Sequence, residues 1–251
     1  MGGVIDKIIS FIAGPPPIKV PKPVHDPLTS KEMKARVLGE IDNYLMDQGF
    51  EPNKKLDDIW IRRRNPLFYD YVGVQTIIRR LPAPVFIEVI VHFGFHLVPF
   101  EKLLSKAGVR RYKSKQPSLS TQLFTLIHEK RKRRGPLKTW LLWDINFSEK
   151  DLKNLIENIG EHGMSFLNGV DDLSALKDRA EKYGGFRRPL KAVCFELLGD
   201  RHEAVRLLNE EMNALKHQAQ GKSRKVTESN EYKAAIIILS AIEAGELEKY
   251  K

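Results

Sequence analysis

The stretch VFIEVIVHFGFHLV, residues 85–98, constrains the fold more than any other part of the chain, because its side chains alternate with a period of two. One face carries Val85, Ile87, Val89, Val91, Phe93, Phe95 and Leu97, and the other carries Phe86, Glu88, Ile90, His92, Gly94, His96 and Val98. Successive side chains of a strand point to opposite faces of the sheet. This stretch therefore predicts a long strand whose apolar face must be covered by other elements.

Shorter alternating runs precede this strand at 58–64 and 69–78. The connections between the three runs are short, and short connections favour antiparallel neighbours. The run TWLLWDINF, residues 139–147, predicts a fourth strand. The strands together predict a mainly antiparallel meander of four strands.

Helical patterns surround the strands. A capping box at Thr29–Glu32 begins a helix with Met33, Val37, Ile41 and Leu45 on one face and Gly49 at its end. A second helix is predicted from Ser148 to Gly160, and others over 171–185, 189–215 (a helical hairpin turning at Gly199-Asp200) and 230–250. We therefore predict an α+β fold, with a four-stranded mainly antiparallel sheet packed by helices in residues 31–185 and a C-terminal helical subdomain in residues 186–251.

Residues 1–30 form a separate arm. VIDKIISFI places Val4, Ile5, Ile8, Ile9 and Ile12 on one face of a short amphipathic helix. Six prolines between positions 15 and 27 then predict a semi-rigid extended spacer. The helix could dock on the body, on a protein partner or, through residues 1–13, weakly on a membrane surface.

The net charge of +10 arises in one place. Residues 101–140 hold 12 Lys and Arg against 2 Asp and Glu, whereas the rest of the chain is neutral. Within the basic insert 101–138, SLSTQLFTLIHEKRKRRGP predicts a helix with Leu119, Leu123, Leu126 and Ile127 inward and a cationic last turn. The candidate binding residues are Arg110, Arg111, Tyr112, Lys113, Lys115, Lys130, Arg131, Lys132, Arg133 and Arg134. Such residues can hold nucleic-acid phosphates and stack a base, contact an acidic protein, or form a solvated surface. Arg62, Arg63, Arg64, Arg79 and Arg80 would extend the patch if they shared its edge of the sheet.

The order of one helix, a three-stranded meander, a Trp-containing strand and further helices resembles the bacterial domains of unknown function known as DUF4304. The resemblance covers residues 31–183 and rests on Gly49-Phe50, Trp60-Ile61-Arg62-Arg63, Phe93-Gly94-Phe95, Trp143, the run 163–167 and Asp172-Leu173. It implies a small α+β protein of adaptor or immunity type, with no enzymatic activity to transfer. The proline-rich arm and the basic insert depart from the pattern.

Motifs for catalysis are weak. Glu88, His92 and His96 would share one strand face, but His92 and His96 would lie about 13 Å apart on a strand, too far to share one metal ion. Asp70 and Glu88 could approach as nuclease carboxylates do, but no lysine follows Glu88 at the spacing such sites use. The sequence has neither a phosphate-binding glycine loop nor a GxSxG elbow. We therefore expect no cofactor and no metal.

Composition bounds the remaining classes. Cys194 is the only cysteine and lies in the apolar run AVCFELL, which predicts a buried inert thiol, no internal disulfide and a reducing compartment. No apolar run approaches the roughly 20 residues of a transmembrane helix. We predict a cytoplasmic, non-catalytic binding protein of bacterial or phage type. One hypothesis is an adaptor or immunity-like protein that engages a protein partner through the exposed sheet face and the N-terminal helix. Another is an RNA- or DNA-binding protein that uses residues 110–138, and a third is a metal-dependent hydrolase.

Overall fold

The computed structural model describes residues 26–53, 56, 58–80, 85–109, 117–131, 140–183, 187–219 and 229–251. Its strands are β1 (Glu51–Pro52), β2 (Ile59–Arg63), β3 (Phe68–Arg80), β4 (Val85–Leu97), β5 (Leu119–Gln122) and β6 (Trp140–Trp143). Its helices are α2 (Ser30–Asp47), α3 (Val98–Lys106), α4 (Leu123–Arg131), α5 (Glu149–Asn158), the π-helix η2 (Ile159–Met164), α6 (Ser165–Asn168), α7 (Leu173–Lys182), α8 (Arg187–Leu197), α9 (Arg201–Ala219), α10 (Asn230–Glu243) and the 3₁₀ turn η4 (Glu248–Tyr250). The predicted α+β class is confirmed.

The sheet is an antiparallel meander in the order β1-β2-β3-β4-β5, with β6 also paired to β4. The long outer edge of β4 is shared by two short strands, because β6 pairs with Phe86–Val89 and β5 with residues 92–95. The sheet therefore has six strands rather than four. The predicted fourth strand is present as β6, and β1 and β5 are additions.

The helix predicted inside the basic insert begins later than expected. Residues 119–122 form β5 rather than the first turn of a helix, and helix α4 starts only at Leu123. Leu119 and Thr121 are buried while Ser120 and Gln122 are less so, which is the two-residue alternation of a strand. The edge of β4 beside residues 119–122 has backbone groups available for pairing, and pairing with them outweighs the helical pattern of this four-residue segment. Val98 also differs from the prediction, because it is the first residue of α3 and not the last residue of β4.

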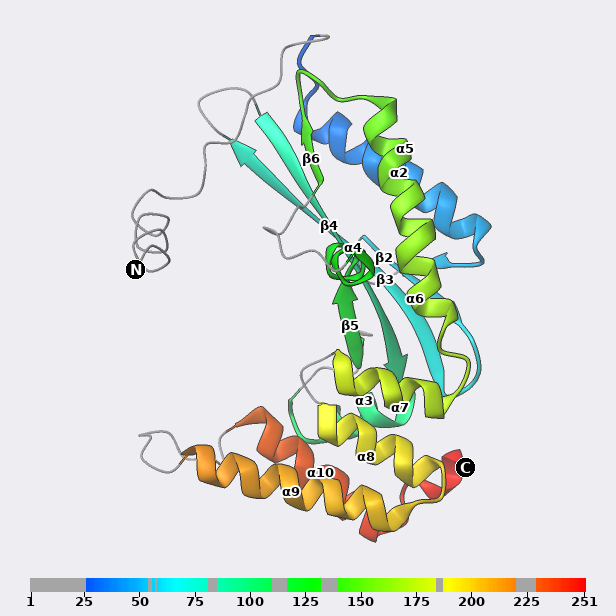
Figure 1. Cartoon of the computed structure of the whole chain (residues 1–251), viewed down its shortest axis with the longest axis vertical. Coiled ribbons are helices and arrows are strands. Elements are labelled where there is room, and N and C mark those ends of the chain that lie inside the picture. The colour runs from blue at the N-terminus through cyan, green and yellow to red at the C-terminus, as the bar shows by residue number, and fades with distance from the viewer. Residues whose placement is uncertain are drawn as a thin grey trace.

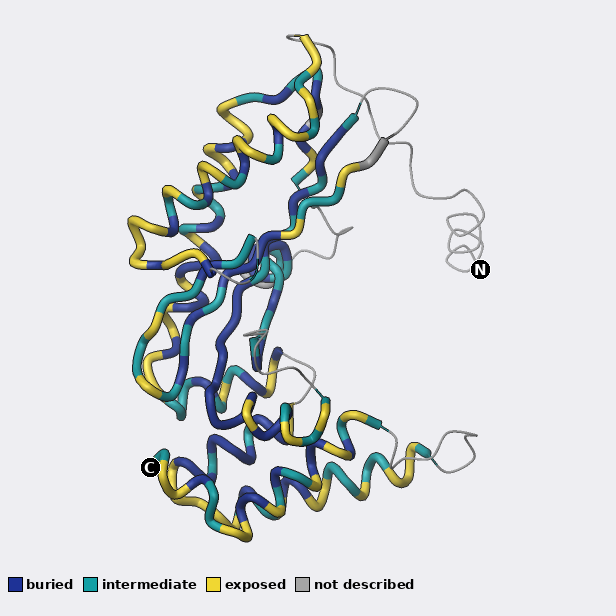
Figure 2. The backbone as a smooth tube through the Cα atoms, turned by 180° about the vertical axis from the view of Figure 1, so that it is seen from behind, coloured by how far each residue is buried: buried dark blue, intermediate teal, exposed yellow. Residues whose placement is uncertain are grey.

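The two faces of the sheet differ in burial. The face we call the covered face holds the apolar side chains of β4 that the sequence placed together, and all of those from Ile87 to Leu97 are buried. The register puts the opposite side chains on what we call the open face. Its members are Ile59, Ile61 and Arg63 of β2, Tyr69, Tyr71, Gly73, Gln75 and Ile77 of β3, Phe86, Glu88, Ile90, His92, Gly94 and His96 of β4, Ser120 and Gln122 of β5, and Leu141 of β6. Gly73, Phe86, Gly94 and His96 are buried, and the other members remain partly or fully exposed (Figure 2).

Helices α2, α5 and α6 lie together on one side of the sheet (Figure 1). The predicted capping box of α2 is present, with Thr29 and Glu32 bonded to each other's backbone amides. The helix predicted to end at Gly160 instead continues as η2 and α6. Gly160 and Gly163 allow close packing rather than termination, because a Cβ on Gly160 would lie 2.8 Å from the Tyr44 hydroxyl and one on Gly163 would overlap the ring of Phe93.

The C-terminal helices α8, α9 and α10 pack beside α3 and α7 at one end of the sheet (Figure 1). The predicted turn at Gly199 is present, with φ of +92°. Cys194 is fully buried, and burial raises the pKa of its thiol to about 12, which confirms an inert core position. Among the described helices, none has the length and apolar character needed to cross a bilayer.

Candidate anion-binding site

Most of the predicted binding residues lie outside the described part of the chain. This holds for Arg110, Arg111, Tyr112, Lys113, Lys115, Lys132, Arg133 and Arg134, and for Val4, Ile5, Ile8, Ile9 and Ile12 in the arm. Lys130 and Arg131 are placed in backbone only, as the last two residues of α4. The structure therefore fixes where the cationic run Lys130–Arg134 begins.

Arg62 and Arg64 do not extend a free basic patch, and the side chains of Arg79 and Arg80 lie outside the described part of the structure. Arg62 and Asp70 are directly paired on the covered face, and Arg62 and Arg64 both donate from Nε to Oδ2 of Asp70 at 2.8 Å. Arg63, between them, points to the open face and is exposed. The nuclease-like pairing of Asp70 with Glu88 is also excluded, because the two carboxylates lie on opposite faces of the sheet. Within the described residues, no group of three His, Cys, Asp or Glu could hold a metal ion.

A pocket of about 400 Å³ lies where α4, η2, α6 and α7 meet. Its lining consists of Leu126, Glu161, His162, Ser165, Phe166, Arg179, Lys182 and Tyr183. Ligand pockets range over roughly 300–1,000 Å³. The volume therefore suits a single small group, such as a phosphate with part of its sugar or base, and not a duplex.

The pocket wall is built from an irregular helix. Residues 159–164 take the wide π-helical turn, a geometry that is frequent at functional sites. The Ser165 hydroxyl donates to the carbonyl of Glu161 at 2.6 Å, a local bond that competes with the helical ladder. His162 is buried beside Glu161, with Nε2 3.8 Å from Oε2. Residues Glu161, His162 and Ser165 therefore bring polar groups to the pocket, next to the apolar side chains of Leu126 and Phe166.

Two cations of α7 line the pocket over aromatic rings. The guanidinium of Arg179 lies 5.3 Å from the centroid of the Phe166 ring, and Nζ of Lys182 lies 5.2 Å from that of Tyr183. The two rings meet edge to face at 5.3 Å. In the part of the chain that the structure describes, no carboxylate pairs with Arg179. Its charge can therefore be neutralised by a bound anion.

Gly169 makes room for this arrangement. A Cβ at Gly169 would lie 2.8 Å from Nη2 of Arg179 and 3.3 Å from the carbonyl of Ser165. The missing side chain lets the guanidinium lie against the backbone at the end of α6.

Helix α4 lies inside the basic insert and leads from the pocket to the cationic run. Leu126 lines the pocket, and Lys130 follows it by four residues, about one turn along the helix backbone. Arg131 ends α4, and the sequence continues directly into Lys132, Arg133 and Arg134. The cationic run therefore starts one helical turn from a pocket that already holds Arg179 and Lys182.

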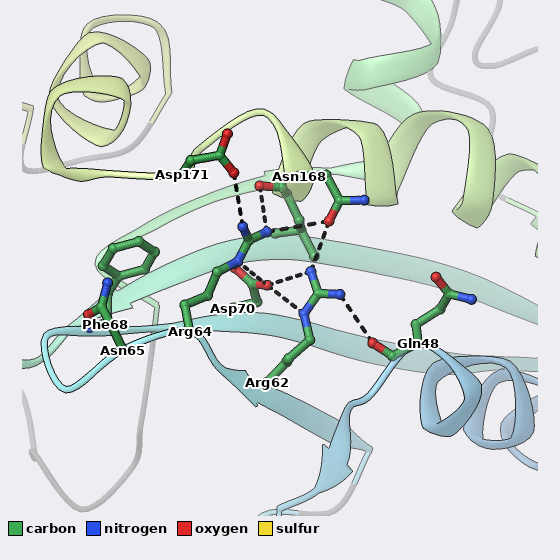
Figure 3. A network of polar contacts seen from close by, with 9 residues as sticks. Gln48, Arg62, Arg64, Asn65, Phe68, Asp70, Asn168 and Asp171 are labelled. Atoms are coloured by element: carbon green, nitrogen blue, oxygen red, sulfur yellow. Dashed lines mark hydrogen bonds and ion pairs between the residues drawn. The ribbon is translucent and has the colours of Figure 1, made fainter.

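A buried polar network holds the pocket wall to the sheet (Figure 3). Asp70 is fully buried; burial raises the pKa of its carboxyl, and the hydrogen bonds from Arg64 and Arg62 oppose that shift. Arg64 donates onward to the carbonyl of Leu167 at 3.0 Å, and Arg62 to Oδ1 of Asn168 at 2.9 Å. The network therefore fixes α6, which carries Ser165 and Phe166, against β2 and β3.

Sequence reasoning missed Arg179, Lys182 and the π-helical wall. In the sequence, cations in the last turn of a predicted helix need no role beyond complementing the helix dipole. Only the folded structure shows that α7 brings these side chains to a pocket that α4 and η2 also line.

Comparison of the chain with protein-family models, with curated proteins and with solved structures found no match in any of the three. The function has to be argued from the site itself.

Proposed function

We propose that this protein binds a polyanion, most simply a single-stranded nucleic acid, along a surface that runs from the α4–α7 pocket onto the basic insert. The observation that carries the proposal is that the pocket lined by Arg179 and Lys182 also includes Leu126 of α4, four residues before the cationic run begins at Lys130. A chain of phosphates binds several cations at once by releasing condensed counterions.

The guanidinium of Arg179 favours nucleic acid over other polyanions. Phe166 and Tyr183 are buried beneath the two cations and support them from below, so their rings are not stacking surfaces. A base can stack on a guanidinium plane while its phosphate pairs with a cation. Acidic proteins and polyphosphates offer the charges without the planar bases.

The proposal predicts a steep salt dependence. If all seven cations, Lys130–Arg134 with Arg179 and Lys182, contacted phosphates, log K against log salt would have a slope of about −5 for a single strand, at roughly −0.7 per contact. Affinity would then fall roughly 10³-fold between 50 and 200 mM salt. If fewer of the seven cations contact phosphates, the slope becomes smaller in proportion to the number of contacts.

The test is fluorescence anisotropy with labelled random-sequence RNA and DNA strands at both salt concentrations. The double variant Arg179→Glu with Lys182→Glu should weaken binding at least tenfold at 50 mM salt. A matched control is Lys150→Glu with Lys153→Glu, which makes the same charge change at the same spacing on exposed positions of α5. Equal affinities for the two double variants would refute a role for the pocket. No binding by the parent protein at 50 mM salt would refute the function and leave an acidic protein as the partner of this surface.

A further inference from the structure

The open face carries aliphatic side chains that the described elements leave partly exposed. Ile59, Ile61, Ile77 and Ile90 are partly exposed on it, and Leu141 is 37% exposed. The helices α2, α5 and α6 gather on the other side of the sheet (Figure 1). A sheet normally buries its apolar residues against a second element. The partly exposed isoleucines, which lie among polar side chains such as Gln75 and Glu88, can therefore contact a segment with branched aliphatic side chains.

The chain itself contains such a segment. The sequence predicts that residues 4–12 form a short helix whose apolar face is made of Val4, Ile5, Ile8, Ile9 and Ile12. A helix of nine residues is about 14 Å long, which spans roughly three strands at about 4.8 Å each. Its length matches the width of the open face from β2 to β4, and its apolar side chains match the partly exposed isoleucines of those strands.

The described chain starts at the edge of the sheet, next to the end of β6. The amide of Leu28 donates to the carbonyl of Asp144 at 3.1 Å, and Asp144 is bonded to Val85 at the beginning of β4. From Val85 to His92, near the middle of the open face, is about 23 Å at roughly 3.3 Å per residue. Residues 13–25, extended as a proline-rich spacer at about 3.1 Å per residue, reach about 40 Å. The arm is therefore long enough to reach the middle of the open face from this edge.

We propose that the N-terminal segment, residues 4–12, docks in cis on the open face and forms a third layer over the sheet. A tether of this length keeps the segment at an effective concentration in the millimolar range, so even weak contacts keep it bound. The inference is independent of polyanion binding, which involves α4 and α7.

The test is thiol labelling with a maleimide, to which the buried native thiol should not contribute. Cys194 is fully buried, so a cysteine introduced in place of the exposed Gln75 on the open face is the thiol expected to react with a maleimide in the folded protein. In this background, Ile5→Asp with Ile9→Asp should speed labelling at least tenfold, because the apolar face of the segment is destroyed. The matched control, Lys7→Ser with Ser10→Asp, makes the same change of −2 on the polar face and should stay within twofold of the parent.

Three results would overturn the proposal. Equal labelling rates for all variants would mean that the segment does not cover Gln75. Protection that is lost when the protein is diluted from 50 to 1 μM would assign the cover to a second copy. Protection that requires added anionic vesicles would assign the segment to a membrane surface. Reaction of Cys194 reports unfolding, so a variant that fails to fold is recognised at once.

Discussion

Replacing Asp70 with asparagine should destabilise the protein strongly, although the change removes only one charge. The carboxylate is fully buried and accepts hydrogen bonds from Arg62 and Arg64, whose side chains are 22% and 18% exposed. Removing one partner of a buried ion pair costs about 3–5 kcal/mol, because the other charge is left uncompensated. Since both arginines keep other acceptors, in Gln48, Leu167 and Asn168, we expect about 3 kcal/mol.

The assay is equilibrium unfolding in urea. With a slope near 3 kcal/mol/M for a chain of this size, the midpoint should fall by about 1 M. The control is Asp171→Asn, which removes another carboxylate bonded to Arg64, at 3.4 Å, but one whose side chain is 84% exposed. An exposed pair contributes about 0–1 kcal/mol. A midpoint for Asp70→Asn within error of that for Asp171→Asn would refute the reasoning that burial makes this network decisive.

Other consequences follow for packing, reactivity and pH. Gly163→Ala should cost about 1–3 kcal/mol by forcing a methyl group into Phe93, whereas Gly39→Ala in the exposed, open part of α2 should gain about 0.5–1 kcal/mol; both are measured by urea unfolding. Cys194, with a thiol pKa of about 12, should react with an aromatic disulfide reagent only at the rate of unfolding. Burial lowers the pKa of His92 below its ordinary value, so the folded state favours the neutral ring. The stability that the neutral ring contributes is complete above the unfolded-state pKa near 6.5, and it is lost as the pH falls through the lower pKa of the folded state. His92→Gln should therefore reduce the loss of thermal stability between pH 7 and 5.

The strongest periodic patterns predicted their elements well. The alternation of residues 85–97 and the apolar face of residues 30–47 each extend over many residues. The first predicts the buried face correctly from Ile87 to Leu97, although Phe86, Gly94 and His96 on the other face are buried as well, and the second describes burial correctly. Where a pattern was short, tertiary contacts determined the secondary structure. Residues 119–122 form β5 because the edge of β4 offers backbone partners, and Gly160 stays inside a helix because α2 passes close to it.

The site was less predictable than the fold. The basic insert was visible as a charge excess, but its meeting with α7 depends on two helices separated by about 40 residues in sequence. Arg62 and Arg64 show the opposite error, since they look like surface cations and are bound to a buried carboxylate. Asp70 gave the one available clue, because a charged residue on the apolar side of a strand requires a partner.

The charge distribution separates stability from binding. Many described cations outside the insert are paired, as in Arg188–Glu211 and Arg201–Glu196, and within the insert Lys106 of α3 pairs with Glu246. Exposed pairs of this kind contribute little each, and a helix end needs no more than a few cations to complement its dipole. The fold therefore does not require five consecutive cations after His128. Replacing Lys132, Arg133 and Arg134 together with glutamine should leave the urea midpoint within about 0.3 M of the parent and reduce the salt slope of nucleic-acid binding by about 2, at roughly 0.7 per lost contact. A loss of stability without a change in slope would mean that the run serves the fold and not a ligand.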